Sequence, residues 1–129
     1  MICGPKKKEA RIFVVDGEPK DYSHVVDAVQ YDKIQFKFFT SGRDALRHNP
    51  EDEPEMWVLN MRLHDMSGVE LSSMLRSRGT NIPMTFVGDK YDVDAEIDAR
   101  TNGAALYFAK PLMSEWLIEA GERVAIADM

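Results

Sequence analysis

Short apolar runs alternate with amphipathic stretches five times along this chain of 129 residues, and no other feature constrains the fold as strongly. Apolar runs of four to six residues have the length of buried strands, whereas stripes at helical spacing indicate helices that bury one face. Strands and helices that alternate along a chain build a parallel sheet with helices packed against it. We therefore predict an α/β fold with a doubly wound, five-stranded parallel sheet.

The expected elements follow from these runs and from the residues that separate them. A helix after Pro19 is predicted from Tyr22, Val25, Val26 and Val29, which fall at i, i+3, i+4 and i+7. Further helices are expected over 43–48, from a cap at Ser67 to Gly79, over 89–102, and in a last segment that carries Trp116. The expected strands are 11–15, 34–39, 56–59, 83–87 and 104–109.

Length and composition predict a single domain over 10–129, preceded by an N-terminal arm over 1–9. The arm contains three consecutive lysines and one cysteine but no apolar core of a signal peptide, so a reducing cytoplasm is the expected location. No apolar run reaches the length needed to span a membrane. The formal net charge of −6 argues against nucleic acid as a partner of this domain.

Functional groups in open parallel sheets collect where the strands end, at their carboxyl termini. In this chain the residues that close the apolar runs are Asp16, Asn60, Gly88 and Lys110. Three of them are polar, so a polar cluster is expected at that edge of the sheet. The three histidines show no spacing typical of a metal site, and we expect them to be solvated.

The segments around these residues resemble bacterial response-regulator receiver domains. Segment 14–19, VVDGEP, is similar to the Asp-Asp-Glu-Pro turn of that family, and segment 109–111, AKP, is similar to its Lys-Pro signature. Segment 56–68 is similar to its third strand and the following loop. The resemblance covers about residues 11–128 and implies the flavodoxin-like (βα)5 receiver fold in a two-component signalling module that is not an enzyme.

The resemblance also assigns positions in a phosphoacceptor pocket. It implies that Asp16 and Gly17 stand at the two acidic positions, Asn60 at the phosphoacceptor, Gly88 at the switching Thr/Ser, Tyr107 at the rotating aromatic and Lys110 at the invariant lysine. Only Asp16, Tyr107 and Lys110 match the family pattern at these positions.

The three departures affect separate steps of phosphorylation. The amide of Asn60 is not an anionic nucleophile, Gly17 lacks a carboxylate that would help to hold Mg²⁺, and Gly88 lacks the switching hydroxyl. We therefore expect a degenerate phosphoacceptor pocket, a pseudo-receiver, with no catalytic residue, no cofactor and weak or absent Mg²⁺ binding. The ordinary structural interpretation of Asp16 and Lys110 is a partly buried ion pair, to which Asn60 adds by donating to Asp16 and accepting from Lys110.

Three hypotheses for function remain open from the sequence. The first is a phosphorylation-independent interaction module that binds a signalling kinase, an output domain or its own copy through the face from Asp89 to Glu122, with Tyr107 and Trp116 as contacts. The second is a phosphorelay receiver that uses another acceptor carboxylate, Asp65 or Asp16. The third is a small-ligand module, because this fold also binds ligands at its strand ends.

Overall fold

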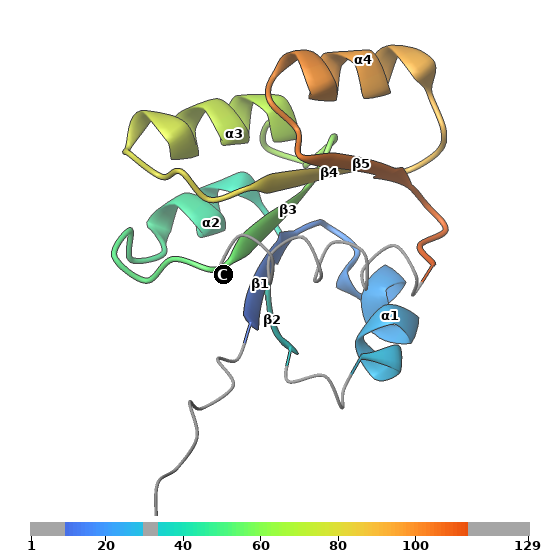
Figure 1. Ribbon diagram of the computed structural model, residues 1–129, viewed down its shortest axis with the longest axis horizontal. Helices are drawn as coiled ribbons and strands as arrows, with labels where there is room; N and C mark the ends of the chain where they lie inside the picture. The colour runs from blue at the N-terminus through green and yellow to red at the C-terminus, as the bar shows by residue number, and fades with distance from the viewer. Residues whose placement is uncertain (1–9, 30–33, 114–129) are drawn as a thin grey trace, which may run out of the picture.

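The computed structural model describes residues 10–29 and 34–113, and it contains a five-stranded parallel sheet (Figure 1). The spatial order of the strands is β2-β1-β3-β4-β5, and every neighbouring pair is parallel. This topology confirms the predicted fold class, a flavodoxin-like α/β fold with a doubly wound parallel sheet. The strands are β1 (Ala10–Val15), β2 (Ile34–Phe39), β3 (Met56–Asn60), β4 (Met84–Gly88) and β5 (Leu106–Ala109).

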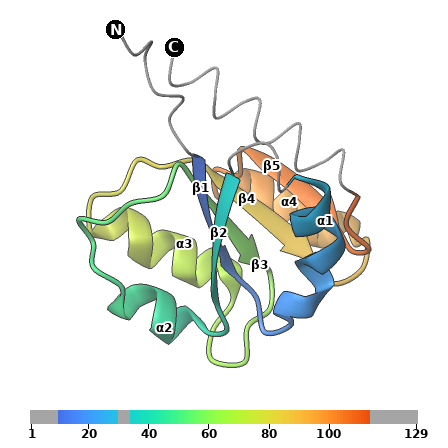
Figure 2. The ribbon, with the colours of Figure 1, turned by 90° about the horizontal axis from the view of Figure 1, so that it is seen from below.

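Helices lie on both faces of this sheet within the described ranges. Helices α2, α3 and α4 lie together on one face, whereas α1 lies on the other (Figures 1 and 2). The helical elements are the 3₁₀ turn η1 (Pro19–Tyr22), α1 (Ser23–Ala28), α2 (Gly42–Arg47), α3 (Gly68–Ser77) and α4 (Val93–Thr101).

Alternate residues of the inner strands form two separate cores. Phe13 and Val15 of β1 join the core under α2, α3 and α4, which includes Trp57 and Leu75. Their neighbours in β1 belong to the opposite core, together with Tyr22 from η1. Because strands β3 and β4 are buried at every position, their apolar runs are continuous, as expected of the inner strands of a parallel sheet. The edge strand β2 alternates instead.

The helix starts are set by side-chain caps. Ser67 accepts a hydrogen bond from the backbone of Glu70 at the start of α3, as its position in the sequence predicts. The helix predicted over 89–102 begins only at Val93, because Asp92 caps it by accepting from the Asp94 backbone. The segment before Asp92 is a loop, which places Asp89 at the strand ends instead of on a helix.

One minor expectation is wrong, since His48 is not solvated. Its side chain is 13% exposed, its ring packs edge-on against Phe13 and Phe39, and its Nε2 bonds to Asp52 at 2.8 Å. The N-terminal arm, the last predicted helix and Trp116 lie outside the described residues. None of the helices in the described ranges is long and apolar enough to cross a membrane.

Candidate functional site

The carboxyl ends of β1, β3 and β5 bring three polar side chains into one cluster, which we call the Asp16 cluster. Asp16 directly follows β1, Asn60 is the last residue of β3, and Lys110 directly follows β5. Asp16 and Asn60 are buried, and the Lys110 side chain is 11% exposed. The fold therefore assembles the polar cluster that the strand ends predict.

Asp16 is the centre of the cluster, and both of its carboxylate oxygens are fully engaged. Oδ2 accepts hydrogen bonds from the Tyr22 hydroxyl at 2.8 Å and from the Asn60 amide at 2.9 Å. Oδ1 accepts from the backbone N–H of Glu18 at 2.9 Å and from Lys110 Nζ at 3.2 Å. Lys110 Nζ also lies 3.0 Å from Oδ2. Since a carboxylate offers about four acceptor sites, this one has none left for a further ligand.

Asn60 joins Asp16 to the loop that follows β4. Its Nδ2 donates both to Asp16 and to Asp89 Oδ1, the latter at 2.8 Å. Its Oδ1 accepts from the backbone N–H of Arg62 at 2.7 Å. The expected donation to Asp16 is confirmed, but the expected acceptance from Lys110 is wrong, because a nearer backbone donor takes the amide oxygen. A carboxylate at this position would instead face two other carboxylates.

Lys110 is the cation of the cluster and neutralises more than one acid. Its Nζ lies 2.8 Å from Asp21 Oδ2 and 3.4 Å from Asp89 Oδ1, in addition to its contacts with Asp16. Burial by itself would lower the pKa of Lys110, but the hydrogen bonds to Asp21 and Asp16 outweigh burial and raise that pKa. Burial, and then the charge of Asp16, raise the pKa of Tyr22 well above its usual value. The cluster therefore holds a charged lysine and a neutral tyrosine.

This donor set does not fit Mg²⁺, the ion that the family resemblance implies. A magnesium ion needs free carboxylate oxygens, whereas the Asp16 oxygens are occupied and an ammonium group already lies beside them. Gly17 supplies no carboxylate, although a Cβ at Gly17 would meet no atom within 4 Å. Across the described residues, no three His, Cys, Asp or Glu side chains are placed so that they could hold a metal ion.

Gly88 and Tyr107 form a second contact at the end of β4. A Cβ at Gly88 would lie 2.3 Å from the Tyr107 hydroxyl, so the tyrosine occupies the space that a side chain at position 88 would need. Tyr107 is 8% exposed, and its buried hydroxyl has no hydrogen-bond partner within residues 10–29 and 34–113. Burial raises the pKa of Tyr107, and the nearby charge of Asp92 adds to that effect. Tyr107 therefore exposes little of its side chain for the partner contact expected from the sequence.

Asp65, an alternative acceptor in the sequence, has a separate role. Its two carboxylate oxygens accept from the backbone N–H groups of Gly42 and Arg43, at 3.0 and 2.9 Å, at the start of α2. Burial would raise the pKa of Asp65, but the two backbone hydrogen bonds lower it. Asp65 therefore caps a neighbouring helix.

Three members of the site were missed from the sequence: Asp21, Tyr22 and Asp89. Tyr22 was assigned only to a buried helical stripe, because its hydroxyl partner is set by the tertiary fold. Asp89 could have been found, since it directly follows the apolar run of β4, where the same strand-end rule applies.

Comparisons with known proteins agree with this geometry. The model of the response regulator receiver domain family matches residues 12–122. The transcriptional regulatory protein FixJ of Rhizobium meliloti is 28% identical over 114 residues, 88% of this chain and 56% of FixJ. The transcriptional regulatory protein TrcR of Mycobacterium tuberculosis is 27% identical over 108 residues, 84% of this chain and 42% of TrcR.

A solved structure shows the same fold at lower identity. The CheY-like response regulator receiver domain protein of Methanospirillum hungatei superimposes with a TM-score of 0.80 at 16% identity, over 94% of this chain and 98% of that one. This chain spans less than two thirds of FixJ and TrcR. The match therefore concerns one domain of those longer regulators.

Proposed function

This chain belongs to the response regulator receiver domain family, and we propose that it is a pseudo-receiver that acts as a phosphorylation-independent protein-interaction module. Receivers of two-component systems are signalling modules that interact with kinases and output domains, and the chain has the fold of such a module. What distinguishes it is the chemistry at the strand ends. The proposal also takes residues 10–129 as one receiver-like domain after the 1–9 arm.

The observation that carries this proposal is the bonding of Asn60. Its amide donates to two carboxylates and accepts a backbone N–H, so it acts as a structural bridge at the position where the family carries its nucleophilic aspartate. An amide nitrogen that donates two hydrogen bonds has no nucleophilic character to offer a phosphoryl group. Lys110, the other residue that would contact such a group, is held by Asp16 and Asp21.

The contact between Gly88 and Tyr107 supports a fixed conformation for this module. The family pattern pairs a hydroxyl residue with a mobile aromatic ring, but here the ring fills the space that the absent side chain leaves. Moving Tyr107 outward would leave a void beside Gly88, and such a void costs packing energy. We therefore expect one rotamer of Tyr107 under all conditions that preserve the fold.

The two alternative functions have less support in the geometry. An acceptor role for Asp16 would require it to release several donors, and an acceptor role for Asp65 would require it to leave the start of α2. A hollow of ≈ 660 Å³ lies beside Lys110, but its lining also includes Glu18, Asp21 and Asp89, and the last two already contact the lysine. These carboxylates disfavour an anionic ligand there.

The test is phosphorylation by a small donor. We expect incubation with acetyl phosphate and Mg²⁺ to leave the intact mass unchanged and to leave the amide NMR spectrum as it is with Mg²⁺ alone. A receiver that retains the family aspartate serves as the positive control in the same buffer. A stoichiometric gain of one phosphoryl group, mapped to any aspartate of this chain, would refute the proposal.

A further inference from the structure

Helix α4 buries its small residues and exposes its large ones. Ala99 is fully buried against the sheet and Ala95 packs against the same core, whereas Val93 and Ile97 are 53% and 58% exposed. Val93 and Ile97 are four residues apart, so they are neighbours on one side of the helix. Apolar residues scattered singly on a surface need no explanation, but a contiguous apolar row indicates an interaction site.

A row of carboxylates runs beside this apolar row. Asp94 and Asp98 are exposed, and each follows one of the two aliphatic residues in the sequence. The only cation within α4 is Arg100, whose guanidinium bonds to Glu96 at 2.9 Å. Arg100 therefore does not neutralise the Asp94 and Asp98 row, which faces solvent.

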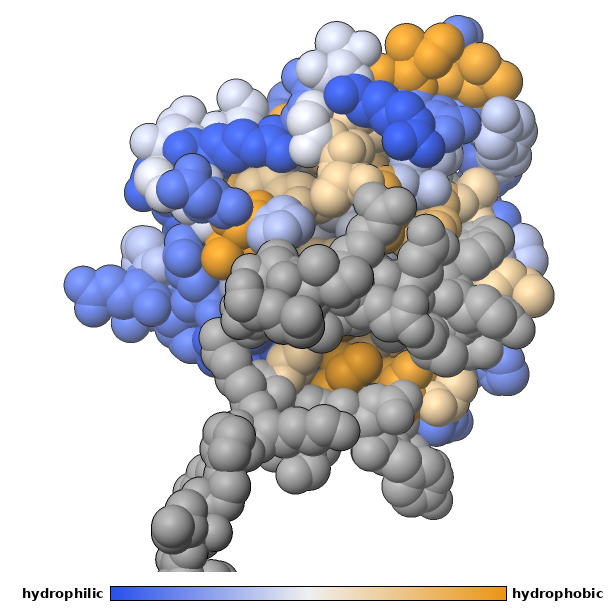
Figure 3. Space-filling view, in the orientation of Figure 1, coloured by the Kyte–Doolittle hydropathy of each residue, from blue (hydrophilic) through white to orange (hydrophobic). Residues whose placement is uncertain are grey.

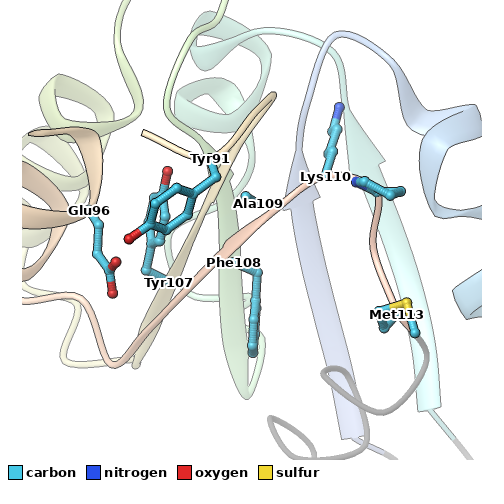
Figure 4. A pocket seen from close by; sticks show the side chains of 8 residues that line it. Tyr91, Glu96, Tyr107, Phe108, Ala109, Lys110 and Met113 are labelled. Atoms are coloured by element: carbon cyan, nitrogen blue, oxygen red, sulfur yellow. The ribbon is translucent and has the colours of Figure 1, made fainter. Parts of the chain in front are cut away.

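A hollow lies between α4 and the end of β5, and its lining residue from α4 is Glu96, which directly precedes Ile97. This hollow has a volume of ≈ 580 Å³, and its lining includes Tyr91, Tyr107 and Met113 (Figure 4). Tyr91 is 66% exposed and Met113 is 48% exposed. Orange apolar atoms gather at the upper edge of the space-filling view, in the region where Figure 1 places α4 (Figure 3). The surface thus combines a mostly apolar hollow, whose one lining cation among the described residues, Lys110, is already paired with Asp16 and Asp21, with an apolar row and an acidic rim.

Resting on the proposed function, we infer that this surface docks a basic amphipathic helix of a partner protein. The apolar side chains of that helix lie on Val93 and Ile97 and enter the hollow beside Tyr91, and its Lys or Arg residues face Asp94 and Asp98. Charge decides between this occupant and a second copy of the chain, because two copies would bring their acidic rims together and each carries a net charge of −6.

The experiment uses the whole chain, labelled with ¹⁵N, and two synthetic 18-residue helical peptides. One peptide has Leu on one face and Lys on the other, and the second has Glu in place of every Lys. We expect the Lys peptide to shift amide signals of Tyr91–Thr101 and Leu106–Met113, with an affinity that falls as salt is added. The Glu peptide should leave those signals unchanged at the same concentration.

Two pairs of charge reversals provide the matched comparison. The double variant Asp94→Lys, Asp98→Lys should bind the Lys peptide about tenfold more weakly than the wild type does and should gain affinity for the Glu peptide. Asp27→Lys with Glu51→Lys makes the same change in net charge at exposed sites away from α4 and should weaken binding of the Lys peptide less than about twofold. Val93→Ser with Ile97→Ser should abolish binding, while circular dichroism confirms that each variant is folded.

Four outcomes would overturn the inference: no binding of the Lys peptide at millimolar concentration, signal shifts confined to another face, equal weakening by both reversal pairs, or self-association of the chain that Ile97→Ser abolishes. The last result would assign the surface to a second copy. The acetyl phosphate experiment on the same sample separates this failure from failure of the proposed function, since phosphorylation and peptide docking are measured independently.

Discussion

The Asp16 cluster and the Gly88–Tyr107 contact lie side by side at the strand ends, yet they satisfy their polar groups in opposite ways. In the cluster, each carboxylate oxygen of Asp16 has at least two donors, and the amide of Asn60 has three partners. At the neighbouring contact, a buried tyrosine hydroxyl has no hydrogen-bond partner among the described residues. A saturated cluster resists the entry of a ligand, whereas an unsatisfied hydroxyl adds no polar stabilisation.

The difference bears on the proposed pseudo-receiver. Under that proposal the Asp16 cluster is a structural element, because Lys110 and the Asn60 amide are held by Asp16 and its neighbouring carboxylates. The tyrosine, in contrast, belongs to the side of the molecule where α4 presents apolar residues to solvent. Changes in the cluster should therefore affect chemistry and stability, and changes at Tyr107 should affect mainly the conformation of the α4 side.

The largest effect is expected when carboxylates of the family pattern are introduced into the cluster at positions 60 and 17. Asn60→Asp alone places a carboxylate against Asp16 and Asp89, and the one positive charge of Lys110 does not neutralise three carboxylates, so their repulsion opposes a reactive geometry. Gly17→Asp adds a second metal-binding carboxylate where a Cβ meets no atom within 4 Å. We expect the double variant to be labelled by acetyl phosphate at least about tenfold faster than Asn60→Asp, as measured by intact mass over time.

Gly17→Asp alone is the control for this experiment, since it adds the metal carboxylate without the nucleophile and should not be labelled. Removing Mg²⁺ with a chelator should abolish labelling of the double variant. Labelling of Asn60→Asp at the same rate as the double variant would show that the second carboxylate is unnecessary and that the comparison of donor sets is wrong.

The sequence predicts most of this fold because the apolar runs have the length of strands that are buried on both faces. Strands β1, β3 and β4 contain little else, whereas the order of the strands in the sheet is set by tertiary packing that these runs do not encode. The helix predicted from residue 89 begins only at Val93, because the sequence does not show that Asp92, among several acidic residues after β4, is the one that caps the helix.

The site was predictable in position and in part of its bonding. The strand-end rule brings Asp16, Asn60, Gly88 and Lys110 together, and the expected Asp16–Lys110 ion pair is present, as is the expected donation from Asn60 to Asp16. The backbone donor to the Asn60 amide oxygen was not predictable from the sequence. Lys110 turned toward Asp21, which comes from η1 and has no strand-end signature. The contact between Gly88 and Tyr107 depends on a side-chain rotamer, which no periodicity in the sequence encodes.

A smaller effect is expected when the cluster loses its cation. Lys110→Ala leaves the buried Asp16 carboxylate without its ammonium partner, and we expect the free energy of unfolding to fall by about 1 to 3 kcal/mol. The loss stays below the range for a fully buried pair because Tyr22, Asn60 and Glu18 still donate to Asp16. Chemical denaturation at neutral pH measures this change.

Coupling and pH sharpen the same test. The double variant Asp16→Asn, Lys110→Met should lose less free energy of unfolding than the sum of the losses in the two single variants. Strictly additive losses would mean that the pair is open to solvent.

The stabilisation by Lys110 should also depend on pH. Because the pKa of Lys110 is raised above 10.5, the folded state holds the proton more tightly than the unfolded state does. The stabilisation by Lys110 is thus present below pH 10.5 and is lost as the pH rises through the folded-state pKa.

The smallest effect is expected at Tyr107, where removing the unsatisfied hydroxyl should change stability by less than about 1 kcal/mol in Tyr107→Phe. Gly88→Ala should cost more, about 1 to 2 kcal/mol, because its Cβ would lie 2.3 Å from that hydroxyl. Gly88→Ala should lower the free energy of unfolding less in the Tyr107→Phe background than in the wild type. The atom nearest to the added Cβ, the Tyr107 hydroxyl oxygen, is then absent, and the nearest remaining atom is the backbone oxygen of Lys90, 3.1 Å from that Cβ. Denaturation of the four proteins gives the coupling energy, and ¹⁹F NMR of fluorotyrosine reports whether Tyr107 moves outward in Gly88→Ala. A cost of Gly88→Ala that is equal in both backgrounds, with no change in the Tyr107 signal, would show that the ring does not depend on the glycine and that the conformation is not fixed by this contact.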